Sequence, residues 1–534
     1  MLLRKKNYLR MLSTAAIMGL AAACGGNYTP SDAKLPDTPT QGQGDDTDKG
    51  NNQGDNTDPS GSTLADLLAN AKDYNILFIT SDEHNAQMVG YERDKLGFST
   101  DIQTPNLDKL AREGEYFTHA YAACPLCAPT RQSIYTGLYP LEHGEFNANA
   151  VFPNQPTWGD FFSARGYYTG VIGKTHDNNP PLTLGFDYVI KQSGDAASDA
   201  ANVDSRLVPD PGLGKPTVPA IDKPYYDAAA LLPQNDGQLR GAVLQNVLQD
   251  RDGIVTKLVQ EFLQTNKDRK FFLHASLVAP HWPWNAPNDF YYMYNPATIQ
   301  MPESSGPPPS WDIQPLNVYT TDDWSQIDDG MTRVFRARYM GALSWMDDNV
   351  GQILKTLDDL GLGQKTIVIY TSDHGDMAGE KGMWFKMVMY EQSVRVPLII
   401  RMPGVITPGT VNDTLINHVD YFPTLAGLSG NAEYIPDTLT GHDLTGAVLG
   451  LSPGPEYTIS VRSTNGLAVL PSVHMVRSKQ YKLVRYNANN FVMYDIDHDR
   501  YETTNIINTA PADVVAAHKK ALNDYITYIT PRWK

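Results

Sequence analysis

Short apolar runs alternate with longer amphipathic segments over most of the chain. The runs are rich in β-branched and aromatic residues, which is typical of strands buried in a parallel sheet. We predict such strands at residues 75–81, 167–172, 271–278, 366–372 and 396–401. After the first of them, residues 105–113 follow a threonine and begin with a proline, and a glycine comes next. This punctuation predicts a helix.

The longest amphipathic segment covers residues 331–360 and predicts a helix with Leu343 and Leu357 on its apolar side. Asp347 and Asp348 are expected on the solvated face of that helix. Strands that alternate with helices indicate an α/β fold. We expect a large mixed, mostly parallel sheet that is sandwiched by helices.

From about residue 451 the pattern changes to short strands and turns. Strands are predicted at residues 458–462, 473–477, 481–486 and 491–495, and a helix at residues 512–528. We therefore expect a main domain at residues 73–450 and a small C-terminal α+β domain at residues 451–534.

The N-terminal residues differ from the rest. Residues 1–23 begin with basic side chains and continue as a short apolar stretch that ends in alanines before Cys24. This pattern is typical of a secretory signal, and the small residues before Cys24 resemble those of a bacterial lipoprotein. Residues 24–72 are polar and predict a disordered linker, anchored to a membrane by a lipid on Cys24. We expect a periplasmic or cell-surface lipoprotein of a Gram-negative-type bacterium, with an ordinary cleaved signal as the alternative.

Charge and cysteine content limit the possible partners. The 534 residues carry a formal net charge of −17, which disfavours nucleic acids and other long polyanions. An anionic substrate therefore needs a local positive pocket. Besides Cys24, the only cysteines are Cys124 and Cys127. Their spacing also matches a redox pair, although the context is not that of a thioredoxin.

Chemically competent side chains follow directly after four of the predicted strands. They are Asp82, Lys174 with His176, His281 and Asp373. Ligands of open α/β sheets bind beyond the carboxyl ends of the strands. These side chains are therefore expected to converge on one site.

The run Cys127-Ala-Pro-Thr-Arg131 is the most informative motif. The other motifs, in chain order, are Ser-Asp82-Glu83-His84, Gly-Lys174-Thr-His176, Pro-His281, Ser-Asp373-His374-Gly and Lys386. Together, from about residue 75 to about residue 505, they resemble the formylglycine-dependent sulfatases of the alkaline phosphatase superfamily. The resemblance covers nearly the whole chain outside its N-terminal leader.

This resemblance implies that a dedicated maturase oxidises Cys127 to formylglycine (3-oxoalanine), whose hydrate is the nucleophile. Cys124 does not match the motif, because leucine stands at the second position after it. The resemblance also implies a divalent metal, Ca²⁺ or Mg²⁺, with five ligands: Asp82, Glu83, Cys127, Asp373 and His374. The family more often has Asp, Asn or Gln where Glu83 stands and Asn or His where His374 stands, and the combination favours Ca²⁺ but leaves Mg²⁺ open.

Fixed cations complete the implied site, because sulfate-ester cleavage develops negative charge. Lys174 would orient the nucleophile, while Lys386 and His281 would face the sulfate and the leaving oxygen. His281 would then act as general acid and His176 as the base of the elimination step. Arg131 would pair with the nucleophile or the anion through its fork of donors.

Four aromatic residues follow His281, namely Trp282, Trp284, Tyr291 and Tyr292. They either stack on sugar rings or anchor a loop to the core, and the sequence leaves both readings open. We expect a sulfatase that hydrolyses sulfate monoesters of carbohydrates. The alternatives are a phosphonate or phosphate ester hydrolase of the same superfamily, a choline-sulfatase-like enzyme and an inactive glycan-binding lipoprotein.

Overall fold

The computed structural model describes residues 63–529, except residues 99, 147–154, 178–183, 193–203, 210, 231–240, 307–326, 463–472 and 487–488. The predicted signal peptide and Cys24 lie outside the described residues. The last part of the predicted linker lies within the described residues. Thr63 caps helix α1 (Leu64–Leu67), and Ala71 is buried in the core. The described chain thus starts at Thr63, and residues 63–72 of the predicted linker already belong to the folded part of the protein.

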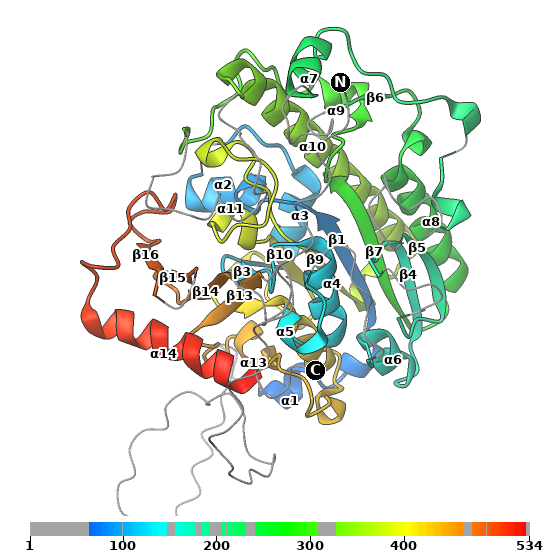
Figure 1. Cartoon of the computed structure of the whole chain (residues 1–534). Helices are drawn as coiled ribbons and strands as arrows, with labels where there is room; N and C mark the ends of the chain where they lie inside the picture. The colour runs from blue at the N-terminus through cyan, green and yellow to red at the C-terminus, as the bar shows by residue number, and fades with distance from the viewer. Residues whose placement is uncertain are drawn as a thin grey trace, which may run out of the picture.

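An eight-stranded mixed sheet forms the centre of the molecule (Figure 1). Its strands in spatial order are β11 (Thr410–Asn412), β2 (Glu115–Phe117), β10 (Leu398–Arg401), β9 (Thr366–Ser372), β1 (Asn75–Asp82), β7 (Phe271–Pro280), β4 (Tyr168–Lys174) and β5 (Tyr188–Gln192). Strands β9, β1, β7, β4 and β5 run parallel, and β10 runs antiparallel to its neighbours β9 and β2. The prediction of a mixed, mostly parallel sheet is therefore confirmed.

Helices cover both faces of this sheet. One face packs against α3 (Pro105–Glu113), α8 (Arg251–Asn266) and α10 (Asp329–Asp359), and the other against α4 (Cys127–Thr136), α6 (Trp158–Ser163) and α12 (His418–Leu428). Strand β1 shows how one short apolar run serves both layers. Leu77 and Ile79 belong to the first cluster, and Ile76 and Phe78 to the second, because successive side chains of a strand point to opposite faces.

The long helix α10 corrects one expectation. Asp347 does not face solvent, since its side chain is only 1% exposed. Its carboxylate accepts hydrogen bonds from the backbone N–H groups of Asn106 (3.1 Å) and Leu107 (2.8 Å) at the start of α3. A carboxylate at this position satisfies N–H groups that have no partner inside the helix.

The C-terminal domain is a separate four-stranded antiparallel sheet, which lies at the left of Figure 1 with α14 beside it. It contains β13 (Thr458–Arg462), β14 (Val473–Arg477), β15 (Tyr481–Arg485), β16 (Phe491–Asp495) and α14 (Ala512–Ile529). The predicted strands and helix are confirmed, with ends that differ by no more than one residue.

The remaining elements are short and connect the main ones. They are the helices α2 (Gly90–Leu96), α5 (Pro140–His143), α7 (Lys223–Ala230), α9 (Asn288–Tyr291), α11 (Glu391–Val394) and α13 (Thr445–Val448), and the strands β3 (Ala120–Tyr121), β6 (Val243–Leu244), β8 (Ala286–Pro287) and β12 (Ile416–Asn417). No helix among the described residues has the length and apolarity that crossing a membrane requires.

Candidate active site

The strand-end side chains meet at one edge of the sheet. Strand β1 ends at Asp82 and β4 at Lys174, while Asp373 and His281 follow the last residues of β9 and β7. These four strands are parallel neighbours, so their carboxyl ends lie side by side. Cys127 is brought to the same edge as the first residue of α4.

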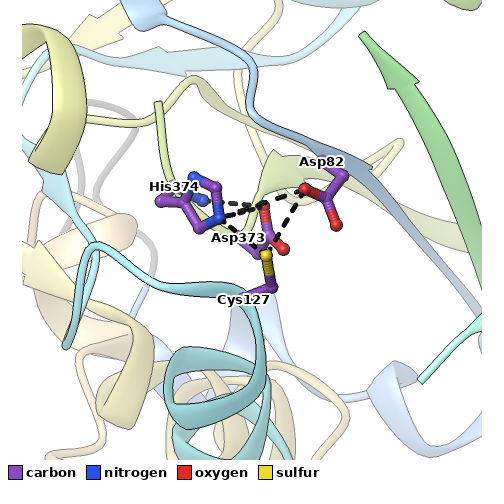
Figure 2. Close-up of side chains that lie close together, drawn as sticks. All are labelled: Asp82, Cys127, Asp373 and His374. Carbon is purple, nitrogen blue, oxygen red and sulfur yellow. Dashed lines mark hydrogen bonds and ion pairs between the residues drawn. The ribbon is translucent and has the colours of Figure 1, made fainter. Parts of the chain in front are cut away.

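The Cys127 thiol points toward His374, Asp373 and Asp82 (Figure 2). Its Sγ is 3.2 Å from Nε2 of His374 and 3.8 Å from Oδ1 of Asp82. The side chain is 1% exposed. Cys124 is also buried, but it belongs to neither of the described groups of candidate metal ligands.

The electrostatics around Cys127 favour negative charge. Burial and the Asp82 carboxylate both oppose ionisation of the thiol. Lys386, Lys174 and His374 outweigh them and hold the pKa of Cys127 well below its ordinary value. At position 127 the nearby cations therefore outweigh the nearby carboxylates, which is the local positive environment that an acidic protein needs for an anionic substrate.

Arg131 lies one turn further along α4, and its guanidinium joins two carboxylates. Nε donates to Asp373 Oδ2 and Nη2 to Asp82 Oδ2, both at 2.9 Å. Nη1 donates to the Lys174 carbonyl (2.9 Å) and to Ser276 Oγ (2.8 Å). These donors are directed at the carboxylates and β-strand ends, and the expected pairing of Arg131 with the nucleophile or the anion stays a prediction.

Asp82 is the most heavily paired carboxylate of the cluster. Besides Arg131, it contacts Lys174, whose Nζ lies 2.8 Å from Asp82 Oδ2. Burial raises the pKa of Asp82, but Lys174, His281 and Arg131 together lower it well below the ordinary value. Asp82 is therefore ionised at neutral pH, as a carboxylate must be to bind a metal.

Glu83 follows Asp82 in the chain and lies near both residues that are predicted to face the substrate, Lys386 and His281. It has a positive φ of 66°, is completely buried and forms an ion pair with Lys386. Its Oε2 lies 3.8 Å from Nε2 of His281. Burial disfavours the charged imidazole, but the carboxylates of Glu83 and Asp82 favour it, and the pKa of His281 is raised on balance.

The ligand atoms of Asp82, Cys127, Asp373 and His374 lie within 4.8 Å of one another, and those of Asp82, Glu83 and His281 form a second group of the same kind. Clustered carboxylates favour a hard divalent cation such as Ca²⁺ or Mg²⁺. Cys127 and His374 are the softer members, and Asp373 and Cys127 raise the pKa of His374 to about 9 against the effect of burial. The donor set fits a divalent cation.

His176 is the predicted site residue that the structure does not connect to this cluster. It follows β4, is buried and has a φ of 55°. Among the described residues, its Nδ1 has no hydrogen-bond partner. Within the described residues no ion pair or hydrogen bond links its ring to Cys127 or to the carboxylates, so its role as base remains a prediction.

The sequence analysis missed two residues that position the site. Ser276 of β7 accepts from Arg131 and donates to the Lys174 carbonyl at 2.6 Å. Asp252 of α8 accepts from the N–H groups of Val278 and Ala279, both at 2.7 Å, and so fixes the end of β7 before His281. The only signal in the sequence for either residue was Ser276 itself, a polar residue within the apolar run at residues 271–278.

The aromatic residues after His281 have different roles. Trp284 and Tyr291 are completely buried; Trp284 packs against Phe335 and Trp384. The sugar-stacking reading is therefore wrong for these two. Trp282 is only half-buried, and its ring centroid lies 5.3 Å from that of His281.

Comparison with known families decides the identity of this arrangement. The sulfatase family matches residues 74–431, and the C-terminal part of N-sulphoglucosamine sulphohydrolase matches residues 379–527. The chain belongs to the sulfatase family. This sulfatase is a sulfuric ester hydrolase, as its motifs predicted.

Relatives support the same assignment. A choline-sulfatase of Rhizobium meliloti is 28% identical over 464 residues, which are 84% of this chain and 85% of the relative. An ulvan-active sulfatase of Formosa agariphila is 27% identical over 450 residues, which are 81% and 77% of the two chains. A protein solved in complex with its substrate D-glucosamine-2-N,6-O-disulfate has a TM-score of 0.66 at 21% identity, covering 86% of this chain and 98% of that protein. It shares the fold.

Proposed function

We propose that this sulfatase cleaves sulfate monoesters of carbohydrates after a maturase has converted Cys127 to formylglycine. The observation that carries the proposal is the position of Cys127. It starts a helix, is buried, and contacts both Asp82 and His374. The carbohydrate substrate is supported by the ulvan-active relative. Formylglycine would supply a hydrated aldehyde as nucleophile and later release the sulfate.

The metal of the proposed site is Ca²⁺, with Mg²⁺ as the alternative. Asp82, Asp373, His374 and the residue at position 127 would hold it, with Glu83 as a further carboxylate. The ion would stabilise negative charge on the sulfate oxygens. Because Arg131 fixes both aspartates, the carboxylates are in place before a metal binds.

Four side chains of the chain itself would perform the remaining steps. Lys174 orients the group at position 127, and Lys386 faces the sulfate. His281 holds a proton on Nε2, the atom nearest Glu83, and gives it to the leaving oxygen. The raised pKa of His281 suits a general acid. His176, whose buried Nδ1 has no partner among the described residues, would act as base.

Secretion is part of the proposal. A lipid on Cys24 would anchor the sulfatase to a membrane through the polar linker, on the periplasmic or outer surface of the cell. Cys24 and the linker up to residue 62 lie outside the described residues. Breakdown of extracellular glycans is the activity that such a location suits.

Mass spectrometry of the Cys127 peptide, from protein made in its native host, tests the nucleophile. An aldehyde at Cys127 is expected, and an unmodified thiol in protein that hydrolyses sulfate esters would overturn this mechanism. Turnover of sulfated sugars, choline sulfate, aryl sulfate and aryl phosphonate then tests the substrate. Choline sulfate is the second candidate because of the choline-sulfatase relative, and a preference for aryl phosphonate would favour the phosphonate hydrolase.

A further inference from the structure

Lys386 lies in an irregular segment with unusual backbone geometry. Four non-glycine residues with positive φ fall within this segment: Ala378 (46°), Lys381 (54°), Phe385 (67°) and Met387 (78°). Such conformations are sparsely populated and persist only when surrounding contacts impose them. The contacts that hold this segment therefore decide where Lys386 is.

One group of contacts comes from the segment itself. Oδ1 of Asp376 accepts hydrogen bonds from the N–H groups of Ala378 (2.7 Å) and Phe385 (3.1 Å). The Met377 N–H donates to the Phe385 carbonyl at 2.7 Å. These bonds close the loop immediately before Lys386, but they do not fix it relative to the rest of the protein.

A second group of contacts comes from the C-terminal domain, through Glu502. The Oε2 atom of Glu502 accepts the backbone N–H of Glu391 at 2.7 Å, and its carbonyl accepts Nζ of Lys381 at 3.0 Å. Glu391 follows Lys386 in sequence and Lys381 precedes it. Glu502 is completely buried, and its own φ of 55° is a conformation that surrounding contacts must impose.

Lys482 of β15 holds the Glu502 carboxylate in place. Its Nζ lies 2.8 Å from Oε1 of Glu502 and 2.7 Å from Oε1 of Glu391, and it donates to the Met389 carbonyl at 2.9 Å. Its contacts with Glu502 and Met389 are hydrogen bonds, and its contact with Glu391 is an ion pair. A buried cation between two carboxylates compensates their charges, and it ties the C-terminal sheet to the residues that follow Lys386.

We infer that Glu502, held by Lys482, is a positioning residue that places Lys386 against Glu83 in the active site. The inference rests on the role of Lys386 in the proposed function. Glu502 contacts the chain on both sides of Lys386, so its carboxylate and carbonyl restrain the segment at two points. The C-terminal domain thereby helps to form the active site. Without it, the segment around Lys386 would keep only its internal contacts within residues 376–385 and its contacts with the main domain.

The test compares Glu502→Gln in the full-length matured enzyme with a matched control, Asp222→Asn. Asp222 is also a buried carboxylate in an ion pair, with Nε of Arg338 at 2.7 Å, and it makes no described contact with the Lys386 segment. Lys381→Met is a milder second variant, which removes the bond to the Glu502 carbonyl and the contact of Nζ with the Tyr390 ring but leaves the Glu502 carboxylate in place. Hydrogen exchange of residues 380–391 and turnover of a sulfate ester are measured for each, alone and combined with Lys386→Met.

Glu502→Gln is expected to accelerate exchange in residues 380–391 and to lower kcat/KM on the order of tenfold to a hundredfold. In the Lys386→Met background it should change kcat/KM by no more than about twofold, because both changes act through the same side chain. Lys381→Met should show the same pattern with smaller effects. Asp222→Asn should leave exchange in this segment at the wild-type rate.

Three results would overturn the inference. They are unchanged exchange in Glu502→Gln, unchanged turnover despite faster exchange, and a Glu502→Gln effect that persists in full without Lys386. Failure of the proposed function looks different, because Lys386→Met would then keep wild-type turnover, or the wild type would not cleave sulfate esters. In that case the hydrogen-exchange measurement still tests whether Glu502 holds residues 380–391 in place.

Discussion

The Arg131 guanidinium and the Asp373 carboxylate are in contact inside the protein, with Nε 2.9 Å from Oδ2 and both side chains no more than 1% exposed. The same guanidinium reaches Asp82 at 2.9 Å. Two buried carboxylates would repel each other without it, so Arg131 is the residue that allows the proposed metal ligands to coexist.

Replacing Arg131 by methionine should therefore destabilise the fold as well as the site. Removal of one partner from a buried ion pair leaves an uncompensated charge, and we expect a loss of about 3–5 kcal/mol in the free energy of unfolding. Urea denaturation of the metal-free protein measures it. Arg206→Met is the control, because its pair with Asp204 is partly exposed and should contribute only about 0–1 kcal/mol. Equal losses in the two variants would contradict this interpretation.

Cys127→Ala should abolish sulfate-ester turnover, since it removes the precursor of the nucleophile. Cys124→Ala should keep kcat within about an order of magnitude, because it removes only a buried thiol from the core. Steady-state kinetics with an aryl sulfate distinguish the two cysteines. Residual activity of Cys127→Ala equal to that of Cys124→Ala would exclude a nucleophile at position 127.

Calcium should stabilise the protein through the Asp82 and Asp373 carboxylates. Binding to the folded state alone adds about 2.7 kcal/mol at a concentration one hundred times the Kd, and EGTA should reverse the gain and remove activity. Thermal unfolding with and without Ca²⁺ measures the effect. Asp373→Asn should lose most of the calcium-dependent shift, whereas Asp348→Asn on α10 should keep it. A full shift in Asp373→Asn would place the metal elsewhere.

The buried His418 should make the protein less stable in acid. Its ring bonds to Thr130 and to the carbonyl of Ser372, and burial lowers its pKa to about 3. Below about pH 6.5 the unfolded chain binds a proton there and the folded chain does not, so stability falls as the pH falls. From about pH 6.5 to about pH 5 this amounts to about 2 kcal/mol.

The matched variants for this pH effect are His418→Gln and His498→Gln. Glutamine retains hydrogen-bonding capacity but does not titrate, so His418→Gln should show a shallower loss of stability between neutral pH and about pH 5. His498 is exposed, and its replacement should leave the slope as in the wild type. Identical slopes in all three proteins would show that His418 does not cause the acid sensitivity.

Trp282 and Trp284 should differ in their effects on the enzyme. Trp282→Ala should raise KM for a sulfated sugar by about twofold to tenfold, the magnitude of an aromatic contact, with little change in unfolding. Trp284→Ala should cost about 3–5 kcal/mol of stability because the indole fills the core. Kinetics and denaturation of both variants measure this contrast. An unchanged KM in Trp282→Ala would exclude it from sugar binding.

Sequence patterns predicted the elements of this sulfatase well. The strand at residues 366–372 and the C-terminal strands were predicted because β-branched runs and turn residues are local signals. The antiparallel direction of β10 was not predictable, since a short apolar run reads the same in either orientation. Asp347 was misplaced for a similar reason. Its partners Asn106 and Leu107 lie more than two hundred residues away in sequence.

The sequence by itself determined which chemical groups the site can contain, because strand ends and the Cys127 motif are local patterns that need no partner to be read. Only the tertiary structure decided how these groups pair. It directed Arg131 to Asp82 and Asp373, it left His176 without a described bond to the cluster, and it buried Trp284 while Trp282 stayed accessible. It also joined Glu502 to Glu391 across 111 residues. Such contacts depend on the packing of distant segments, which no periodicity within a segment specifies.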